Sequence, residues 1–315
     1  IVLENKAQLE GALIPSGHMM INSLLRSRMS VAGWLSEKTG GVAQLYFLRE
    51  LVEQIEADWA GVLENLESIR KLLINRKAMY CNVTVDKANW EIFQPQLTDF
   101  LKGLPAFDFE GQTWDTQVPD KPEGMTIPAQ VNYVGKGANV YNLGYELHGS
   151  MSVIQKYIST TWLWEKVRVQ GGAYGGMMSF DPSTGVFNYL SYRDPNLLGT
   201  LENYDGTPGF LKELELSESE LSKSIIGAIG GLDQYQLPDA KGYTSLVRHL
   251  TGYTNQARQQ YRDEVLSTTA KEFKAFAAML DKVKENGKIV VLGSKEAIEE
   301  ANEAQKDFLT INRVM

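Results

Sequence analysis

The chain has 315 residues, of which 43% are apolar, and its 39 acidic and 31 basic residues give a formal net charge of -8. This length and apolar content suffice to bury the core of one large or two ordinary domains, which excludes a disordered protein. The acidic balance argues against a nucleic-acid partner and favours cationic peptides, and no apolar run approaches the ~20 residues that cross a bilayer.

The first third of the chain predicts helices, one strand and a further helix. Apolar residues recur at helical spacing over residues 16–75, and residues 79–85 combine β-branched and aromatic side chains in a strand-like run. Asp86 is placed to cap a helix that runs to Leu101. Residues 106–128 are rich in Pro, Gly, Asp and Gln and have no sustained period, so we predict a linker there.

The single cysteine, Cys81, excludes an intramolecular disulfide and fits a reducing compartment. Because it lies within the strand-like run, we expect a buried structural thiol. The sequence opens with neither a signal peptide nor an Arg/Ser-rich transit peptide, so we expect any targeting segment to lie upstream of Ile1.

After the linker the pattern becomes mixed α/β. Residues 129–133 are strand-like, Gly135 to Gly137 resembles a turn, and Ser150 is placed to cap a helix that ends at Gly171-Gly172. Two alternating runs, residues 173–180 and 186–192, flank the turn-forming residues 181–185 and predict a hairpin, and therefore a partly antiparallel sheet.

The last third is mostly helical. Thr207-Pro208 resembles a helix start, and Ser217 with Glu220 forms a capping-box pattern. Helical spacing continues to Lys284, then residues 288–292 predict a strand and Ser294 a capped final helix. Both thirds thus end in long helices, one strand and one helix, which favours a duplicated α/β unit whose first copy is incomplete.

The sequence lacks the strong signals of metal and nucleophile chemistry. Its histidines, His18, His148 and His249, have no second histidine four residues away, so neither orientation of the zinc-protease motif is present. We interpret His148 and His249 as structural. The serine-nucleophile elbow, the phosphate loop and the calcium loop are also missing, so no metal ligand is predicted in this chain.

Gly171, Gly172, Ala173 and Gly175 form a glycine-rich segment that leads from a helix end into a strand. A dinucleotide fingerprint has the opposite order, with the glycines before a helix N-terminus. A glycine-rich strand edge instead suits the close approach of an extended peptide, so we predict these four residues as substrate-binding.

Arg168 and Tyr174 flank that segment. A guanidinium and a phenol are suited to bind a carbonyl oxygen and to stabilise the negative charge that develops on it during peptide-bond attack. The alternative is structural: Arg168 complements the helix dipole, worth about 0.3–1 kcal/mol, and Tyr174 packs on the sheet. Spacing alone favours the structural interpretation.

Longer motifs resemble a known family. Residues 161–176 (TWLWEKVRVQGGAYGG), 190–197 (LSYRDPNL), 235–243 (YQLPDAKGY) and 31–34 (VAGW) are similar to the C-terminal half of the presequence proteases, which are pitrilysin-like zinc metallopeptidases of the inverzincin type. The resemblance extends over nearly the whole chain. It implies an α/β fold in which a mostly antiparallel sheet packs against long helices in two-layer domains.

By this resemblance the full protein has four homologous domains in two halves around a peptide chamber. Residues 1–105 are then the C-terminal part of the third domain, 106–128 the linker and 129–315 the fourth domain. The zinc ligands lie in the missing N-terminal half, and Arg168 and Tyr174 match the fourth domain's arginine and tyrosine, which reach the scissile peptide. The resemblance thereby reverses the interpretation from spacing, so catalytic roles for Arg168 and Tyr174 become our prediction. The expected substrates are targeting presequences and other short unstructured peptides, in the mitochondrial matrix or chloroplast stroma.

Two functions stay open. In the first, this chain is the metal-free half of a zinc metalloendopeptidase, closes the chamber and is inactive alone. In the second, it belongs to a pitrilysin-like subunit without metal that serves only for binding or assembly. A zinc motif in the remainder of the protein would decide for the first.

Overall fold

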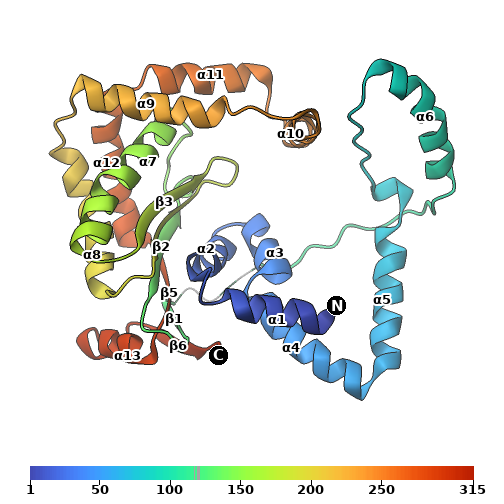
Figure 1. Ribbon diagram of the computed structural model, residues 1–315, viewed down its shortest axis with the longest axis horizontal. Helices are drawn as coiled ribbons and strands as arrows, with labels where there is room; N and C mark the ends of the chain where they lie inside the picture. The colour runs from blue at the N-terminus through green and yellow to red at the C-terminus, as the bar shows by residue number, and fades with distance from the viewer. Residues whose placement is uncertain (117, 119–120) are drawn as a thin grey trace. The chain divides into compact units, whose positions relative to one another are not determined.

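The structure is a computed structural model that describes residues 1–116, 118 and 121–315. It has two compact units, drawn in Figure 1: the first comprises residues 1–49, 116–232 and 260–315, and the second residues 50–115 and 233–259. In chain order the elements are α1 (Val2–Ala12), α2 (Gly17–Ser27), α3 (Val31–Gly40), α4 (Val42–Ala57), α5 (Trp59–Leu73), η1 (Arg76–Ala78), α6 (Lys87–Lys102), β1 (Glu123–Thr126), β2 (Tyr133–Asn139), α7 (Ser150–Thr160), η2 (Trp164–Gln170), β3 (Gly175–Asp181), β4 (Val186–Tyr192), α8 (Leu198–Lys212), α9 (Glu218–Leu232), α10 (Pro238–Thr251), α11 (Asn255–Leu266), α12 (Ala270–Asn286), β5 (Lys288–Gly293), α13 (Lys295–Ala304) and β6 (Thr310–Arg313).

The first unit is built on a six-stranded sheet of order β3-β4-β2-β5-β1-β6. The three pairs from β3 to β5 are antiparallel, whereas β1 runs parallel to both β5 and β6. In the β3–β4 hairpin Gly175 lies opposite Tyr192. The strand β3 therefore forms one edge of the sheet, with its outer side unpaired among the described residues.

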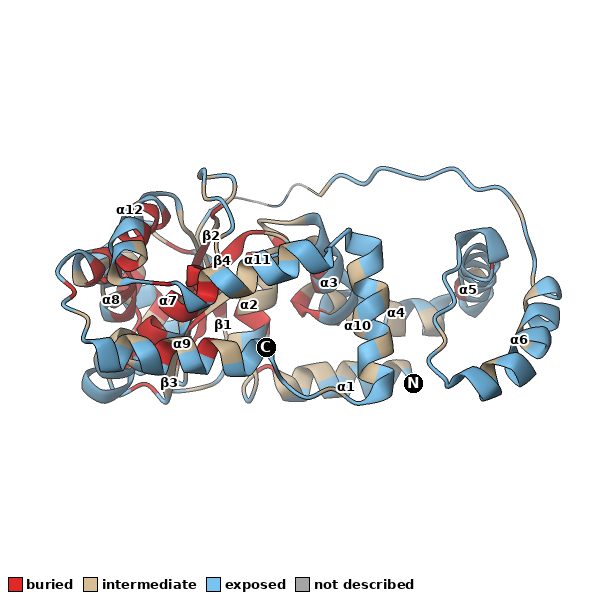
Figure 2. Ribbon diagram, turned by 90° about the horizontal axis from the view of Figure 1, so that it is seen from above, coloured by how far each residue is buried: buried red, intermediate tan, exposed pale blue. Residues whose placement is uncertain are grey.

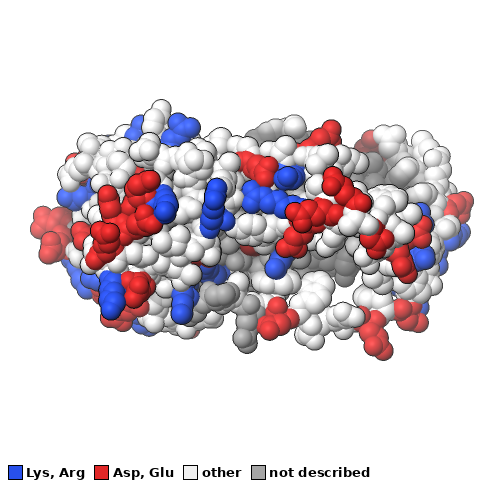
Figure 3. All heavy atoms as spheres, turned by 90° about the horizontal axis from the view of Figure 1, so that it is seen from below, with Lys and Arg blue, Asp and Glu red and all other residues white. Residues whose placement is uncertain are grey.

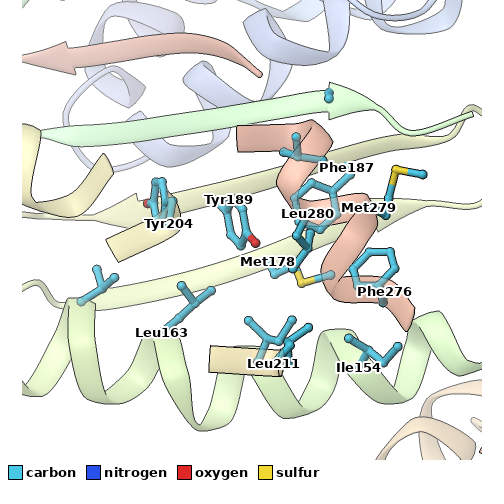
Figure 4. Close-up of a cluster of buried hydrophobic side chains, with 14 of the residues drawn as sticks. Ile154, Leu163, Met178, Phe187, Tyr189, Tyr204, Leu211, Phe276, Met279 and Leu280 are labelled. Atoms are coloured by element: carbon cyan, nitrogen blue, oxygen red, sulfur yellow. The ribbon is translucent and has the colours of Figure 1, made fainter. Parts of the chain in front are cut away.

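One face of this sheet carries the larger core. Side chains from the strands, among them Met178, Phe187 and Tyr189, meet side chains from α7, α8 and α12, as Figure 4 shows. Ile154 of α7 and Leu280 of α12 are almost fully buried there. The mostly antiparallel sheet against long helices, as predicted, is confirmed.

The opposite face of the sheet is covered by α2, from the first block of the sequence. Ile21 and Leu25 of α2 have no exposed surface and pack with Tyr133, Leu190 and strand residues of β5 in a second core. Neighbouring strand residues alternate between the two faces, and both sets are apolar because both faces are buried. The sheet thus has a helical layer on each side, one more than the two-layer domain predicted.

The second unit is helical and contains few buried side chains. The fully buried Asn75 links its two chain segments: its amide nitrogen donates to the Phe107 carbonyl at 2.9 Å and its amide oxygen accepts from the Phe107 N–H at 3.2 Å. Figure 2 shows α5 and α6 mostly exposed, whereas the sheet of the first unit and the helices on it are rich in buried residues.

Several sequence predictions are confirmed in detail. The hairpin turns at residues 182–185, and β5 is followed by α13, whose Ala297 N–H donates to the Ser294 hydroxyl at 3.0 Å. Asp86 accepts from the Asn89 N–H at the start of α6, and Ser217 and Glu220 exchange the two hydrogen bonds of a capping box.

The predicted strand at residues 79–85 is wrong. These residues form no strand, and Cys81 is exposed rather than buried. They belong to the helical second unit, whereas every described strand lies in the first unit. A strand-like sequence needs neighbouring strands to satisfy its backbone, so β propensity alone was not sufficient here.

Three other boundaries differ. Gly135 to Gly137 lie inside β2 and not in a turn, because a side chain at Gly135 would meet Leu25 of α2 at 2.8 Å. Pro208 is internal to α8, which begins ten residues earlier than Pro208 because Leu201 and Tyr204 pack into the core. The predicted linker contains β1, and β6 was not predicted.

The compact units also group the chain differently from the predicted segments, since residues 1–49 lie in one unit with residues 116–232. Residues 117, 119 and 120 of the predicted linker lie outside the described residues. Acidic and basic side chains are interspersed on the face drawn in Figure 3, and none of the helices in the described ranges is long and apolar enough to cross a membrane.

The packing of α2 gives a stability prediction. Leu25→Ala should lower the free energy of unfolding by about 2–5 kcal/mol, because it leaves a cavity between α2 and β2. Leu66→Ala, at an exposed leucine of α5, is the matched control and should change it by less than about 0.5 kcal/mol. Urea unfolding followed by circular dichroism measures both, and equal effects would mean that α2 is not packed on the sheet.

Candidate active site

The predicted site lies where η2 ends and β3 begins, at the edge of the sheet. The π-helix η2 closes with two backbone bonds, from the Gly172 N–H to the Arg168 carbonyl (3.0 Å) and from the Ala173 N–H to the Val167 carbonyl (3.1 Å). Gly172 has φ +79°, in the left-handed region that favours glycine. This conformation turns the chain from the helix into the edge strand. π-helical turns are rare and recur at functional sites.

The start of β3 approaches η2 closely. A side chain at Gly176 would lie 2.9 Å from Cβ of Val167 and 3.1 Å from the Leu163 carbonyl oxygen. Val167 and Leu163 are fully buried, so they cannot move aside. The glycine at 176 thus fixes the start of the edge strand against the helix that carries Arg168.

Arg168 is exposed in the last turn of η2, and its guanidinium carbon lies 4.0 Å from the centre of the Trp164 ring. This stacking holds the guanidinium plane with about 0.5–1 kcal/mol at an exposed site. In the described part of the chain no carboxylate pairs with Arg168. Its N–H groups therefore remain available to a ligand.

Tyr174 is 68% exposed, although its backbone is fixed. Its N–H donates to the carbonyl of Tyr192 at 2.9 Å and contacts that of Arg193 at 3.3 Å. Its ring meets the Tyr192 ring edge-on, with centroids 6.1 Å apart. Tyr174 thus presents its phenol at the surface from a rigid strand end.

The segment after β4 supports this turn from behind. Arg193 has φ 48°, a strained conformation for a residue with a side chain. Asp194 is fully buried, exchanges backbone hydrogen bonds with Asn132 (2.7 and 2.8 Å) and accepts from the Thr200 hydroxyl at 2.7 Å; burial raises the pKa of its carboxyl. Asn196 then donates to the Gly171 carbonyl at 2.6 Å, which fixes the end of η2.

The structure brings the predicted residues together as one helix end, turn and strand start. The alternation of exposure separates them: Arg168 and Tyr174 are exposed, whereas Ala173 is only 3% exposed and belongs to the core. The predicted contact between Ala173 and a substrate would therefore not involve its side chain. Gly171, Gly172 and Gly175 are partly or largely exposed.

Sequence reasoning did not find Trp164 and Asn196. The spacing of four between Trp164 and Arg168 on a helix is a usable signal for stacking. Asn196 gave no signal, because it reaches Gly171 only through the tertiary fold.

The described residues contain no group of three or more His, Cys, Asp or Glu side chains that could hold a metal. His148 bonds Ser150 through its own ring nitrogen, and His249 is an exposed residue of α10. A zinc site does not fit these residues.

Comparison with known proteins places this fold in a peptidase class. Residues 1–51 match the family described as associated with the peptidases of family M16, subfamily C, and residues 122–295, more than half of the chain, match the PreP C-terminal domain. The chain therefore belongs to the presequence protease family, as its C-terminal part.

Relatives agree with this assignment. "Presequence protease 1, chloroplastic/mitochondrial" of Arabidopsis thaliana is 46% identical over 315 residues, which cover 100% of this chain and 29% of the relative. "Protein HypA" of Clostridium perfringens is 31% identical over 95% of this chain and 30% of its own length. The chain thus spans less than a third of these relatives.

Among solved structures, a conserved protein from Enterococcus faecalis V583 has a TM-score of 0.52 at 13% identity, with 93% of this chain and 67% of that chain covered. This likeness concerns the fold alone.

Gly172 gives a direct test of the turn. Gly172→Ala should destabilise the protein by about 1–2 kcal/mol, because an L-residue pays that much in the left-handed region. Gly209→Ala is the matched control: Gly209 lies in helix α8 with open space around its α-carbon, so it should be neutral or stabilising by about 0.4–1 kcal/mol. Chemical denaturation compares the two, and equal effects would contradict the assigned turn.

Proposed function

We propose that this chain is the metal-free half of a presequence-protease-type metalloendopeptidase, in which it closes the peptide chamber and supplies Arg168 and Tyr174 to the scissile carbonyl. The observation that supports this most is that both side chains are exposed on fixed backbone at the two ends of one turn, beside an unpaired strand edge. Packing alone gives no reason for an exposed arginine and tyrosine there.

In the proposed complex an extended peptide adds to the outer edge of β3. Backbone N–H and C=O groups of β3 would pair with the peptide backbone, which binds unstructured peptides without regard to sequence. Gly171, Gly172 and Gly175 leave room for that backbone. Folded proteins cannot offer a free strand of this kind, so the substrate class is short unstructured peptides, including targeting presequences.

Arg168 and Tyr174 would then act on the carbonyl of the bond to be cut. Both donate hydrogen bonds, and the arginine carries a permanent charge. Their contribution grows as the carbonyl oxygen becomes negative, so they stabilise the transition state more than the bound substrate. No proton has to leave either residue.

We place the zinc ion and its ligands in the remainder of the longer protein, because the described residues offer no ligand set. We also propose residues 1–105 as the end of a third domain and 129–315 as a fourth domain of four related units. A mitochondrial or plastid location is proposed from the name of the Arabidopsis relative. The competing function is a metal-free pitrilysin-like subunit that binds or assembles without cleavage.

The first prediction concerns the site in the full-length protein. Tyr174→Phe keeps the ring and removes the hydroxyl, and Arg168→Lys keeps the charge and removes the planar fork. Each should lower kcat by about 100- to 1000-fold, the usual loss for one oxyanion donor. Steady-state cleavage of a short fluorogenic peptide measures this. Rates within about threefold of the parent for both variants would assign the two residues to packing.

The second prediction concerns the 315-residue chain by itself. It should retain no stoichiometric zinc after dialysis and should not cleave the same peptide. Metal analysis and the fluorogenic assay are the measurements. One tightly bound zinc per chain, with chelator-sensitive cleavage, would contradict the division of labour proposed here. An intact parent that binds peptides without cutting them would favour the metal-free subunit.

A further inference from the structure

The ring of Tyr192 lies at the centre of an aromatic cluster that joins three parts of the first unit. Its ring centroid lies 4.8 Å from that of His18, 5.8 Å from that of Tyr133 and 6.1 Å from that of Tyr174. The Arg193 guanidinium carbon lies 5.5 Å from it. We call these five side chains the Tyr192 cluster.

The cluster connects buried and exposed chemistry. Tyr133 is fully buried and its hydroxyl donates to the Ile14 carbonyl, so it cannot shift. Tyr174 lies at the other end and is 68% exposed. Tyr192 lies between them and is half-buried, and it is the ring that the described residues place against Tyr174. Edge-to-face contacts of this kind prefer one relative orientation.

His18 supports Tyr192 from α2. Its ring is nearly perpendicular to that of Tyr192, at 70°, and its Nδ1 atom is buried without a hydrogen-bond partner. Burial lowers the pKa of His18, and its place in the first turn of α2, where the helix dipole disfavours a cation, acts in the same direction. His18 therefore packs as a neutral ring.

We propose that Tyr192, supported by His18, is a positioning residue that fixes the orientation of the Tyr174 phenol. This inference rests on the proposed function, because it assumes that Tyr174 acts on the substrate. Two fixed points define the Tyr174 side chain: its N–H is bonded to the Tyr192 carbonyl and its ring touches the Tyr192 ring. A phenol that projects into solvent has free rotation about two bonds, so the second contact selects the rotamer that catalysis needs.

The test is a cycle of variants in the full-length protein. Tyr192→Leu removes the ring and should lower kcat by about 10- to 100-fold, the range expected for a misplaced catalytic group, with little change in KM. Tyr192→Phe keeps the ring and should stay within about threefold of the parent. Tyr80→Leu, at an exposed tyrosine of the second unit, controls for loss of a tyrosine and should have no effect.

Coupling to Tyr174 separates positioning from general destabilisation. With Tyr174→Phe already present, Tyr192→Leu should cost less than about threefold more, because the group that it positions is gone. If the two losses multiply instead, Tyr192 acts independently of Tyr174 and the inference is wrong. If Tyr174→Phe alone leaves the rate unchanged, the proposed function fails; if Tyr174→Phe lowers it and Tyr192→Leu does not, only the positioning inference fails.

A second readout needs no catalysis. In the 315-residue chain with labelled tyrosine rings, the ring signals of Tyr174 should shift towards those of a free tyrosine in Tyr192→Leu, and partly so in His18→Ala. His18→Phe keeps a ring at this position and should preserve them. Unchanged Tyr174 signals in Tyr192→Leu, in a variant that is folded by circular dichroism, would overturn the proposal.

Discussion

The close contact between α2 and β2 is the constraint on which the rest of the structure depends. A side chain at Gly17 would lie 2.4 Å from the Tyr133 ring, and one at Gly135 would lie 2.8 Å from Leu25. Glycine on both sides of the contact lets helix and strand approach closely, and it buries the second face of the sheet. Arg26 of α2 also pairs with Asp181 at the hairpin turn, at 2.7 Å. The same contact brings His18 to Tyr192.

The candidate site inherits its rigidity from this double cover. An edge strand backed on one face only would bend, whereas β3 is tied through β4 to strands that are packed on both faces. Gly172 and Asn196 then fix the turn, and Trp164 holds the Arg168 guanidinium. The two exposed donors need little reordering when a substrate arrives, which is how preorganised donors gain their effect.

Local patterns predicted much of this. The hairpin, the caps at Asp86 and Ser294, and the helix end at Gly171 each depend on neighbouring residues, so the sequence carries them directly. Residues 79–85 and the pair Gly135 and Gly137 failed for the opposite reason. Whether a β-rich run forms a strand, or a glycine pair forms a turn, depends on what packs against it from far along the chain. The Tyr192 cluster combines α2 with two strand ends, and no local pattern contains it.

The central claim is that the outer edge of β3 binds an extended peptide beside Arg168 and Tyr174. Amide hydrogen exchange on the 315-residue chain, with and without a short unstructured cationic peptide, tests it most directly. The account predicts slower exchange at those amides of Gly175–Asp181 that do not bond to β4, with the rest of the sheet unchanged. Protection confined to another part of the chain, or none at saturating peptide, would contradict it.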